Sequence, residues 1–125
     1  MISSVGNGLL LFVGIEKGDQ PETVKTYAEK VSRLRIFEDS RGKTNLSVKE
    51  VGGRVLVVSQ FTLAADLAGG NRPSFDKAEL PQKAQALVSW FCQVLQECGL
   101  EVLQGSFGDH MKVELVNDGP ATYIL

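Results

Sequence analysis

A long apolar run at residues 55–63 constrains the fold more than any other part of the sequence. It reads Val-Leu-Val-Val-Ser-Gln-Phe-Thr-Leu and is rich in β-branched residues. Continuous apolar runs of this length are typical of strands buried on both faces, so we expect a strand over 55–63. A buried hydroxyl or amide without a partner costs about 1–3 kcal/mol. Ser59, Gln60 and Thr62 must therefore bond neighbouring backbone or face an opening where a ligand binds.

The composition is that of an ordinary globular chain. The sequence has 125 residues, of which 43% are hydrophobic and 22% charged, which predicts a single domain over 1–125 with its own core. Thirteen Lys and Arg against fifteen Asp and Glu give a formal net charge of −2. No broad cationic face is available, so any nucleic-acid contact must be local and limited in area. The composition argues mildly against RNA, and DNA is not an expected partner.

Cysteine use and the absence of targeting signals favour a cytoplasmic protein. Cys92 and Cys98 lie six residues apart in an expected helix, on different faces, so we expect no disulfide between them. No cationic segment followed by a long apolar one opens the chain, and no apolar stretch is long enough to cross a bilayer. We therefore expect no membrane partner.

The remaining pattern predicts an α/β domain in which two helices cover one side of a mixed β-structure of about six strands. The first helix is expected over 21–35, opened by a capping box of Asp19 and Glu22, and the second from Pro81 until Gly99 ends it. The expected strands are residues 8–15, 45–48, 55–63, 100–107, 111–116 and 121–125. Residues 64–77 are expected to form a loop, and Arg72 and Phe75 make it a candidate binding segment.

Several kinds of site can be set aside. One His and two unsuitably spaced Cys make no standard zinc set, and no acidic cluster has calcium-loop spacing, so no metal is expected. A Ser-His-Asp triad would require His110, but a lone His in a loop between strands is more often solvated than catalytic. The glycines at 6–8 precede a strand, which is the wrong context for a phosphate-binding loop.

Five motifs in order carry a family resemblance. They are Leu-Arg-Ile-Phe at 34–37, Asn-Leu-Ser-Val at 45–48, Ser-Gln-Phe-Thr-Leu at 59–63, Arg-Pro-Ser-Phe at 72–75 and Asn-Asp-Gly-Pro-Ala-Thr at 117–122. Together they resemble the D-aminoacyl-tRNA deacylase family, from about Val5 to the C-terminus. Each motif alone is weak, but their combination and order are specific.

The resemblance implies a homodimeric hydrolase without metal or cofactor. It would cut the ester between a D-amino acid, or glycine mischarged on tRNA-Ala, and the 3′ end of tRNA, and so serve chirality proofreading in translation. The implied site comprises Ser59, Gln60, Phe61 and Thr62 as catalytic positions, Gly119 and Pro120 as selectivity positions, and Met111 and Asn117 as pocket neighbours. In the family the Gly-Pro bond is cis and reaches into the partner's pocket, where its carbonyls reject L-amino acids.

Elementary chemistry is compatible with this implied site. Backbone N–H groups near a strand end can stabilise an ester oxyanion without a charged residue. Thr62 has no evident base nearby, so we expect it to position the substrate while the ribose hydroxyl of the tRNA assists hydrolysis. An X-Pro bond adopts cis at a cost of only about 0.5–1 kcal/mol, and Gly119 lacks a Cβ that would obstruct a substrate. Without the family likeness, residues 117–120 would be interpreted as a plain turn.

The sequence also departs from the family pattern. Family members begin with a further strand and most of another before the segment near Val5, so we expect an N-terminally shortened domain. Ala64 and the Asp109-His110 pair are smaller departures. Two alternatives therefore stay open: a non-catalytic paralogue that acts as a binding or assembly protein, and a deacylase for tRNA mischarged with small L-amino acids, the latter suggested by Ala121.

Overall fold

The computed structural model describes residues 1–125 as one α/β domain. The elements in chain order are β1 (Gly8–Val13), α1 (Pro21–Arg33), β2 (Phe37–Glu38), β3 (Thr44–Leu46), β4 (Arg54–Ser59), the 3-10 helix η1 (Phe61–Ala64), α2 (Pro81–Glu97) and β5 (Val102–Gln104). β1, β4 and β5 form a three-stranded sheet in the order β1-β4-β5, whereas β2 and β3 form a separate antiparallel pair. The predicted α/β class with a mixed β-structure is confirmed.

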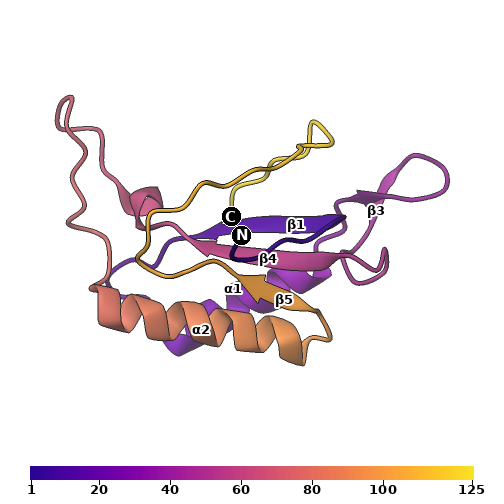
Figure 1. The fold of residues 1–125 in the computed structure, drawn as a ribbon, viewed down its shortest axis with the longest axis horizontal. Helices are drawn as coiled ribbons and strands as arrows, with labels where there is room; N and C mark the ends of the chain where they lie inside the picture. Colours follow the sequence, from indigo (N-terminus) through magenta and orange to yellow (C-terminus); the bar gives the residue numbers. More distant parts are fainter.

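The three-stranded sheet is parallel throughout. Leu10 lies opposite Leu56, which in turn lies opposite Leu103. Each connection between neighbouring strands contains one helix, and right-handed crossovers that step in one direction across a sheet place both helices on the same face. Figure 1 shows α1 and α2 on that face, while the C-terminal segment runs over the other face.

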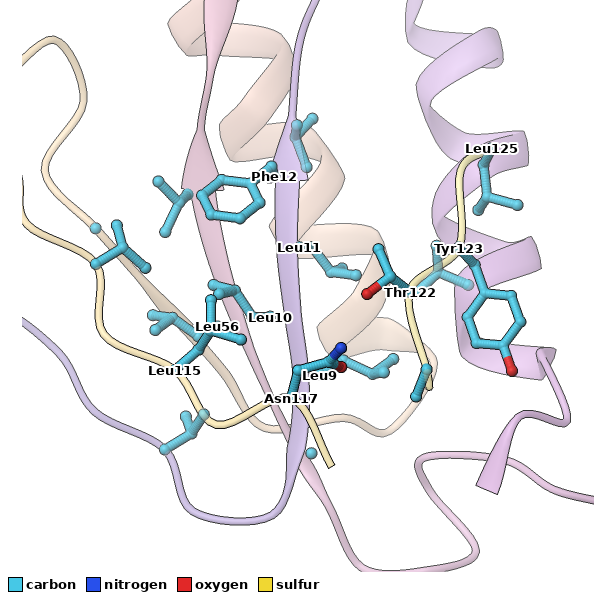
Figure 2. A pocket seen from close by; sticks show the side chains of 18 of the residues that line it. Leu9, Leu10, Leu11, Phe12, Leu56, Leu115, Asn117, Thr122, Tyr123 and Leu125 are labelled. Atoms are coloured by element: carbon cyan, nitrogen blue, oxygen red, sulfur yellow. The ribbon is translucent and has the colours of Figure 1, made fainter. Parts of the chain in front are cut away.

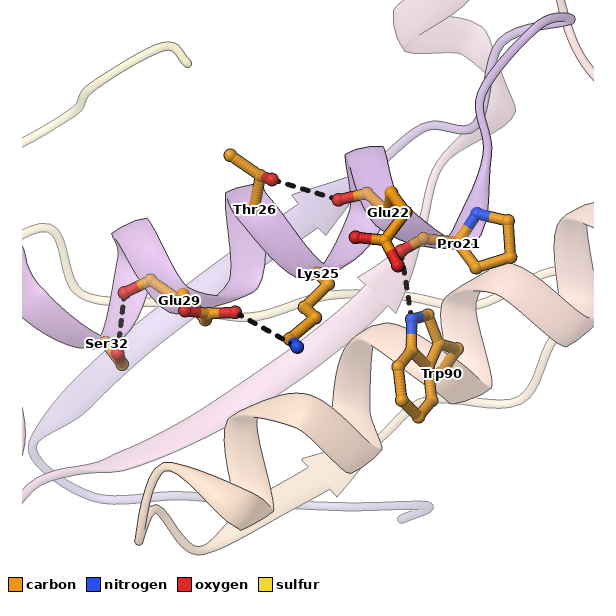
Figure 3. A network of polar contacts seen from close by, with 7 residues as sticks. All are labelled: Pro21, Glu22, Lys25, Thr26, Glu29, Ser32 and Trp90. Carbon is orange, nitrogen blue, oxygen red and sulfur yellow. Dashed lines mark hydrogen bonds and ion pairs between the residues drawn. The ribbon is translucent and has the colours of Figure 1, made fainter.

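The core lies between the sheet and the two helices. Alternate residues of the central strand point into it, and Val55 and Val57 are almost fully buried, as is Leu95 of α2. Fifteen buried residues form one connected apolar cluster, so the expectation of a single core is met. The indole N–H of Trp90 in α2 donates to the Pro21 carbonyl at 3.0 Å and ties the two helices together (Figure 3).

The outer side of α1 carries only local polar contacts. Lys25 and Glu29 approach to 4.0 Å, and the Thr26 hydroxyl donates to the Glu22 carbonyl at 2.9 Å (Figure 3). These exposed contacts contribute little to stability, about 0.3–0.5 kcal/mol for a helical ion pair. The helix is therefore held mainly by the apolar face that it buries.

Both helices were predicted, but the capping of α1 differs from expectation. α1 begins at Pro21, as expected, and ends at Arg33, two residues early. Gln20 is the N-cap, and its N–H donates to the Thr23 hydroxyl at 3.4 Å, so the predicted box of Asp19 and Glu22 is wrong. The Asp19 carboxylate instead accepts from the backbone N–H of Glu16 at 2.8 Å, because the preceding turn brings that donor closer than the helix end.

The central strand is shorter than its apolar run. β4 ends at Ser59, and the Gln60 N–H makes the last bond to β1, to the Val13 carbonyl at 2.9 Å. From Phe61 onward the chain coils into η1 because β1 offers no further ladder partner. The predicted strand over 55–63 is therefore correct only to residue 59.

Two further strands predicted near the C-terminus are wrong. Residues 111–116 and 121–125 contain no strand, and residues 110–125 make no backbone–backbone hydrogen bond. The segment crosses the apolar face of the sheet, which accounts for its alternating apolar residues. It forms no strand because it does not lie along a sheet edge, where backbone groups are free to pair. The strand expected over 100–107 is confined to β5, and the short β2–β3 pair replaces the single strand expected at 45–48.

Two smaller findings complete the fold. Cys92 and Cys98 are free, as predicted, and burial raises the pKa of the Cys92 thiol to about 11. No helix has the length and apolar character needed to cross a membrane.

Candidate active site

A cleft of about 770 Å³ opens at the carboxyl end of β4. Parallel strands commonly present their ligand sites at this end, where loops leave the sheet. The cleft brings together residues from four separate segments of the chain. Its lining includes Lys17, Ser59, Gln60, Phe61, Phe75, Asp76, Glu79, Phe107, Asp109, His110 and Met111.

The polar residues at the end of β4 have distinct surroundings. The Gln60 side-chain amide donates to the Thr62 hydroxyl, with 2.6 Å between Nε2 and Oγ1. Ser59 has no hydrogen-bond partner for its side chain within the protein and lines the cleft, whereas exposed Thr62 lies outside its lining. The choice posed by the sequence is thus resolved differently for each residue: Gln60 and Thr62 satisfy one another, and Ser59 faces an opening.

A glycine allows the segment after β4 to turn toward the cleft. A Cβ on Gly14 would lie 3.0 Å from the Gln60 carbonyl oxygen and 3.0 Å from the Leu63 Cβ. Because both neighbours belong to the turn into η1, a larger residue would displace this turn. The position of Phe61 in the cleft therefore depends on the close packing of η1 over the end of β1.

Two aromatic rings form one wall of the cleft. The ring centroids of Phe61 and Phe75 are 5.1 Å apart, with an angle of 63° between the ring planes, and both rings are partly exposed. The loop that carries Phe75 is closed by reciprocal backbone bonds between Asp66 and Ser74 at 2.8 and 2.9 Å, and Lys77 approaches the Asp66 carboxylate to 3.8 Å. The candidate binding loop of 64–77 thus contributes Phe75 to the site. Arg72 is exposed outside the cleft lining.

Met111 is held at the cleft by the loop that follows β5. The Ser106 N–H donates to the Met111 sulfur at 3.2 Å, and a Cβ on Gly105 would lie 2.9 Å from this same sulfur. The absence of a side chain at Gly105 therefore creates the space that the thioether occupies. Met111 and Ser59 line the same cleft.

The charged residues of the cleft are mostly acidic. Asp76, Glu79 and Asp109 line it together with one lysine, Lys17. The Leu80 N–H, and then Lys83 at 3.4 Å, lower the pKa of Glu79 from its ordinary value. Three carboxylates and one lysine therefore line the cleft, an excess of acidic groups that the net charge of the whole chain did not reveal.

The other predicted residues lie in a separate groove. Asn117, Gly119 and Pro120 belong to the C-terminal segment, and the Gly119–Pro120 bond is cis. The groove lies between this segment and the open face of the sheet, where Figure 2 shows Leu115 and Asn117 with side chains of β1 and β4. Within one chain the predicted site is therefore divided between cleft and groove. The residues that border both are Ile15, Val58, His110, Met111 and Val113.

Some cleft residues were not predicted as site residues. Phe107, Glu79 and Asp76 belong to loops that converge only because β4 and β5 are neighbours. Strand order was not readable from the sequence, so no local signal could have found them together. No three or more His, Cys, Asp or Glu side chains are grouped so that they could hold a metal ion.

Fold and site together define a small α/β domain with a cleft at the carboxyl end of its parallel strands, and comparison with known families identifies the family. A family model described as D-Tyr-tRNA(Tyr) deacylase matches residues 1–125, so the chain belongs to this family.

Individual relatives agree with this assignment. A D-aminoacyl-tRNA deacylase from Thermodesulfovibrio yellowstonii is 51% identical over 99% of this chain and 85% of its own length. The enzyme of the same name from Thermotoga petrophila is 53% identical over 99% of this chain and 83% of its own length.

Among solved structures, a c-Myc DNA unwinding element binding protein matches with a TM-score of 0.87 and 34% identity, over 95% of this chain and 81% of that one. A probable eukaryotic D-amino acid tRNA deacylase matches with a TM-score of 0.79 and 16% identity, over 93% of this chain and 83% of that one. The second likeness supports the fold alone.

Proposed function

We propose that this protein hydrolyses the ester bond of D-aminoacyl-tRNA and so acts in chirality proofreading of translation. The observation that carries this proposal is family membership over the whole chain, combined with identity near 50% to enzymes named D-aminoacyl-tRNA deacylase. The reaction would release free tRNA and the D-amino acid. Glycine mischarged on tRNA-Ala would be a further substrate, because glycine has no side chain that a wall at Cα could reject.

The cleft supports a mechanism based on positioning and on backbone donors. Phe61 lines the cleft, and its N–H lies at the start of η1, where the leading donors of a helix have no intrahelical partner. We infer that it stabilises the oxyanion that forms when the ester carbonyl is attacked, and loss of one such donor costs about 2.7–4 kcal/mol in a well-studied hydrolase. Ser59 and Gln60 would orient the aminoacyl group beside Phe61.

Thr62 acts in this mechanism as a positioning residue. Its oxygen accepts the Gln60 amide, and no carboxylate or imidazole accepts its proton, so it has no partner that would make it a nucleophile. The ribose hydroxyl adjacent to the ester is available to assist attack by water. No metal ion or cofactor takes part in this scheme.

Selectivity would come from a second copy of the chain. Gly119 and Pro120 line the groove, outside the cleft of their own subunit, while Asn117 precedes them on the same segment. The open face beside them exposes large apolar side chains, among them Phe12 at 42% and Leu115 at 57%. A symmetric dimer that covers this face could bring the partner's Gly119 carbonyl to Met111. Such a wall rejects a substituent on one side of Cα whatever the side chain is.

The decisive experiment compares the hydrolysis of three aminoacyl-tRNA substrates. Purified protein is incubated with D-Tyr-tRNA, L-Tyr-tRNA and L-Ala-tRNA, and the remaining aminoacylated tRNA is measured over time. Release from the D form alone supports the proposed function. Release from none would indicate the non-catalytic paralogue, and release from L-Ala-tRNA would indicate the deacylase for small L-amino acids.

The proposed cellular setting is the cytoplasm, where tRNA is aminoacylated, with the aminoacylated 3′ end as the nucleic-acid partner. With a net charge of −2, the contact with RNA would have to be local and small in area. The printed name of the DNA unwinding element binding protein describes that relative only.

A further inference from the structure

His110 is the only histidine of the chain and lies where the cleft and the groove meet. It lines both, and no other ionisable side chain does so. The side chain is exposed, and its imidazole makes no hydrogen bond or ion pair within the protein. An imidazole without a partner beside a binding cleft has both nitrogens available for a ligand.

The loop around His110 is fixed on both sides. The Asp109 N–H donates to the Ser106 carbonyl at 3.3 Å and closes a turn, and the Ser106 hydroxyl donates to the Asp109 carboxylate. The Ser106 N–H binds the Met111 sulfur at 3.2 Å. Asp109 is thus engaged by its own loop and does not pair with the neighbouring imidazole, which is held at the cleft with its nitrogens free.

The charges around the cleft make this position significant for an anionic ligand. The charged groups that line the cleft are Lys17 from the loop after β1, Asp76 and Glu79 from the loop before α2, and Asp109 from the loop after β5. Lys83 of α2 pairs with Glu79 at 3.4 Å, and Lys112 and Glu114 follow His110 along the groove. Histidine is the side-chain type that changes charge between about pH 5 and 8. A phosphate entering this mostly acidic cleft is repelled unless a cation offsets the carboxylates. A protonated His110 would supply such a cation where the cleft and the groove meet.

We propose that His110 binds the phosphodiester joining the last two nucleotides of the RNA 3′ end, and that it binds this phosphate more tightly when protonated. The proposal rests on the proposed function for the identity of the ligand as an RNA 3′ end. It assigns His110 to substrate binding and not to proton transfer. The contact is exposed, so its contribution to affinity should be about 2- to 5-fold.

The direct test follows the imidazole signals of His110 by NMR, which a single histidine makes unambiguous. The wild-type protein is titrated between about pH 5 and 8 alone, with the trinucleotide CCA, and with adenosine. CCA should raise the midpoint of the His110 titration, because the phosphate stabilises the imidazolium, and adenosine should leave it unchanged. An unchanged midpoint with CCA, or equal shifts with both probes, would overturn the proposal.

Kinetics provide a second test with matched variants. With D-Tyr-tRNA, the wild-type KM should fall about 2- to 5-fold from pH 8 to pH 5.5 at constant kcat. His110→Gln should abolish this fall, and His110→Lys should keep the low KM throughout. Lys25→Gln, which removes a positive charge from α1, outside the lining of both cleft and groove, should retain the wild-type pH profile. An identical KM profile for wild type and His110→Gln would contradict the proposal.

The two tests separate this proposal from the proposed function. If no D-Tyr-tRNA is hydrolysed, the proposed function fails, yet the NMR titration with CCA still decides whether His110 binds the phosphate. If hydrolysis occurs and CCA leaves the His110 midpoint unchanged, the function stands and the assignment of His110 is rejected.

Discussion

The side-chain amide of Gln60 donates to the hydroxyl oxygen of Thr62 across 2.6 Å, immediately after the strand that ends at the cleft. This bond orients both side chains and occupies a lone pair on the oxygen that a threonine nucleophile would use. Since no base accepts the hydroxyl proton, the Thr62 oxygen keeps the weak nucleophilicity of an ordinary alcohol. The pair therefore shapes the η1 turn and does not form a catalytic dyad.

Replacing Thr62 tests this conclusion. Thr62→Val keeps the shape and removes the hydroxyl, and we expect kcat/KM for D-Tyr-tRNA to fall by less than about tenfold, because the backbone donors remain. Loss of a true nucleophile costs far more, about 10⁴- to 10⁶-fold. The control is Thr26→Val on the exposed side of α1. A covalent D-tyrosyl ester of Thr62, trapped by acid quench and located by mass spectrometry, would refute this view.

The space above Gly105 offers a second test. In Gly105→Ala the new Cβ would lie 2.9 Å from the Met111 sulfur, so this flexible side chain must move away from Ser106. We expect KM for D-Tyr-tRNA to rise by several-fold while the free energy of unfolding changes by less than about 1.5 kcal/mol, because a thioether adapts readily. Gly69→Ala, whose Cβ would meet nothing within 4 Å, serves as control. A KM equal to wild type would mean that Met111 does not border the substrate.

The sequence predicted the helices and the central strand because their signals are local. Pro81 and Gly99 mark the ends of α2, and the apolar run at 55–58 can only be a buried strand. The C-terminal segment was misinterpreted because alternation indicates an apolar face on one side of a segment and says nothing about its hydrogen-bond partners. The site residues were predicted from family motifs, which do not indicate where the residues lie relative to one another in the folded chain. Its division between cleft and groove depends on strand order, which has no local signal.

The buried helix–sheet interface should dominate stability. Leu95 is 0% exposed in the last turn of α2, so Leu95→Ala should lower the free energy of unfolding by about 2–5 kcal/mol. Leu67→Ala removes the same atoms from a side chain that is 65% exposed and should change stability by less than about 0.5 kcal/mol. Urea unfolding followed by circular dichroism measures both. Similar losses for the two variants would contradict the placement of the core.

The turn between β2 and β3 should confer a pH-dependent stability. The N–H groups of Lys43 and Arg41 bind the Asp39 carboxylate at 3.1 and 2.9 Å and lower its pKa from the ordinary value of 3.8. A lowered pKa in the folded state stabilises the protein above pH 3.8, and this contribution is lost as the pH falls through the folded pKa. Asp39→Asn should therefore be less stable than wild type near neutral pH, and the difference should shrink in acid.

Urea unfolding of wild type and Asp39→Asn at about pH 7 and about pH 3 measures this difference. Asp118→Asn is the matched control, because its carboxylate makes no hydrogen bond or ion pair within the chain. A difference that is constant from neutral pH to acid would show that the Asp39 charge does not contribute.

The proposed sharing of the site between two subunits makes a quantitative prediction. Gly119 and Pro120 line the groove and are absent from the cleft lining of their own chain, so each cleft needs a partner to complete it. A cleft variant, Gln60→Ala with Phe61→Ala, should be inactive as a pure dimer. A groove variant, Gly119→Ala, whose Cβ would lie 2.1 Å from the Ala121 nitrogen, should hydrolyse L-Tyr-tRNA as well as D-Tyr-tRNA because its wall is displaced. When equal amounts exchange subunits at random, half of the dimers are mixed, and each mixed dimer has one intact cleft facing one intact Gly119–Pro120 segment. Exchange should therefore lower the hydrolysis of L-Tyr-tRNA about twofold and leave that of D-Tyr-tRNA unchanged. Unchanged hydrolysis of L-Tyr-tRNA after exchange would show that both parts of the site act within one chain, and sedimentation of the wild type as a monomer would exclude the shared site altogether.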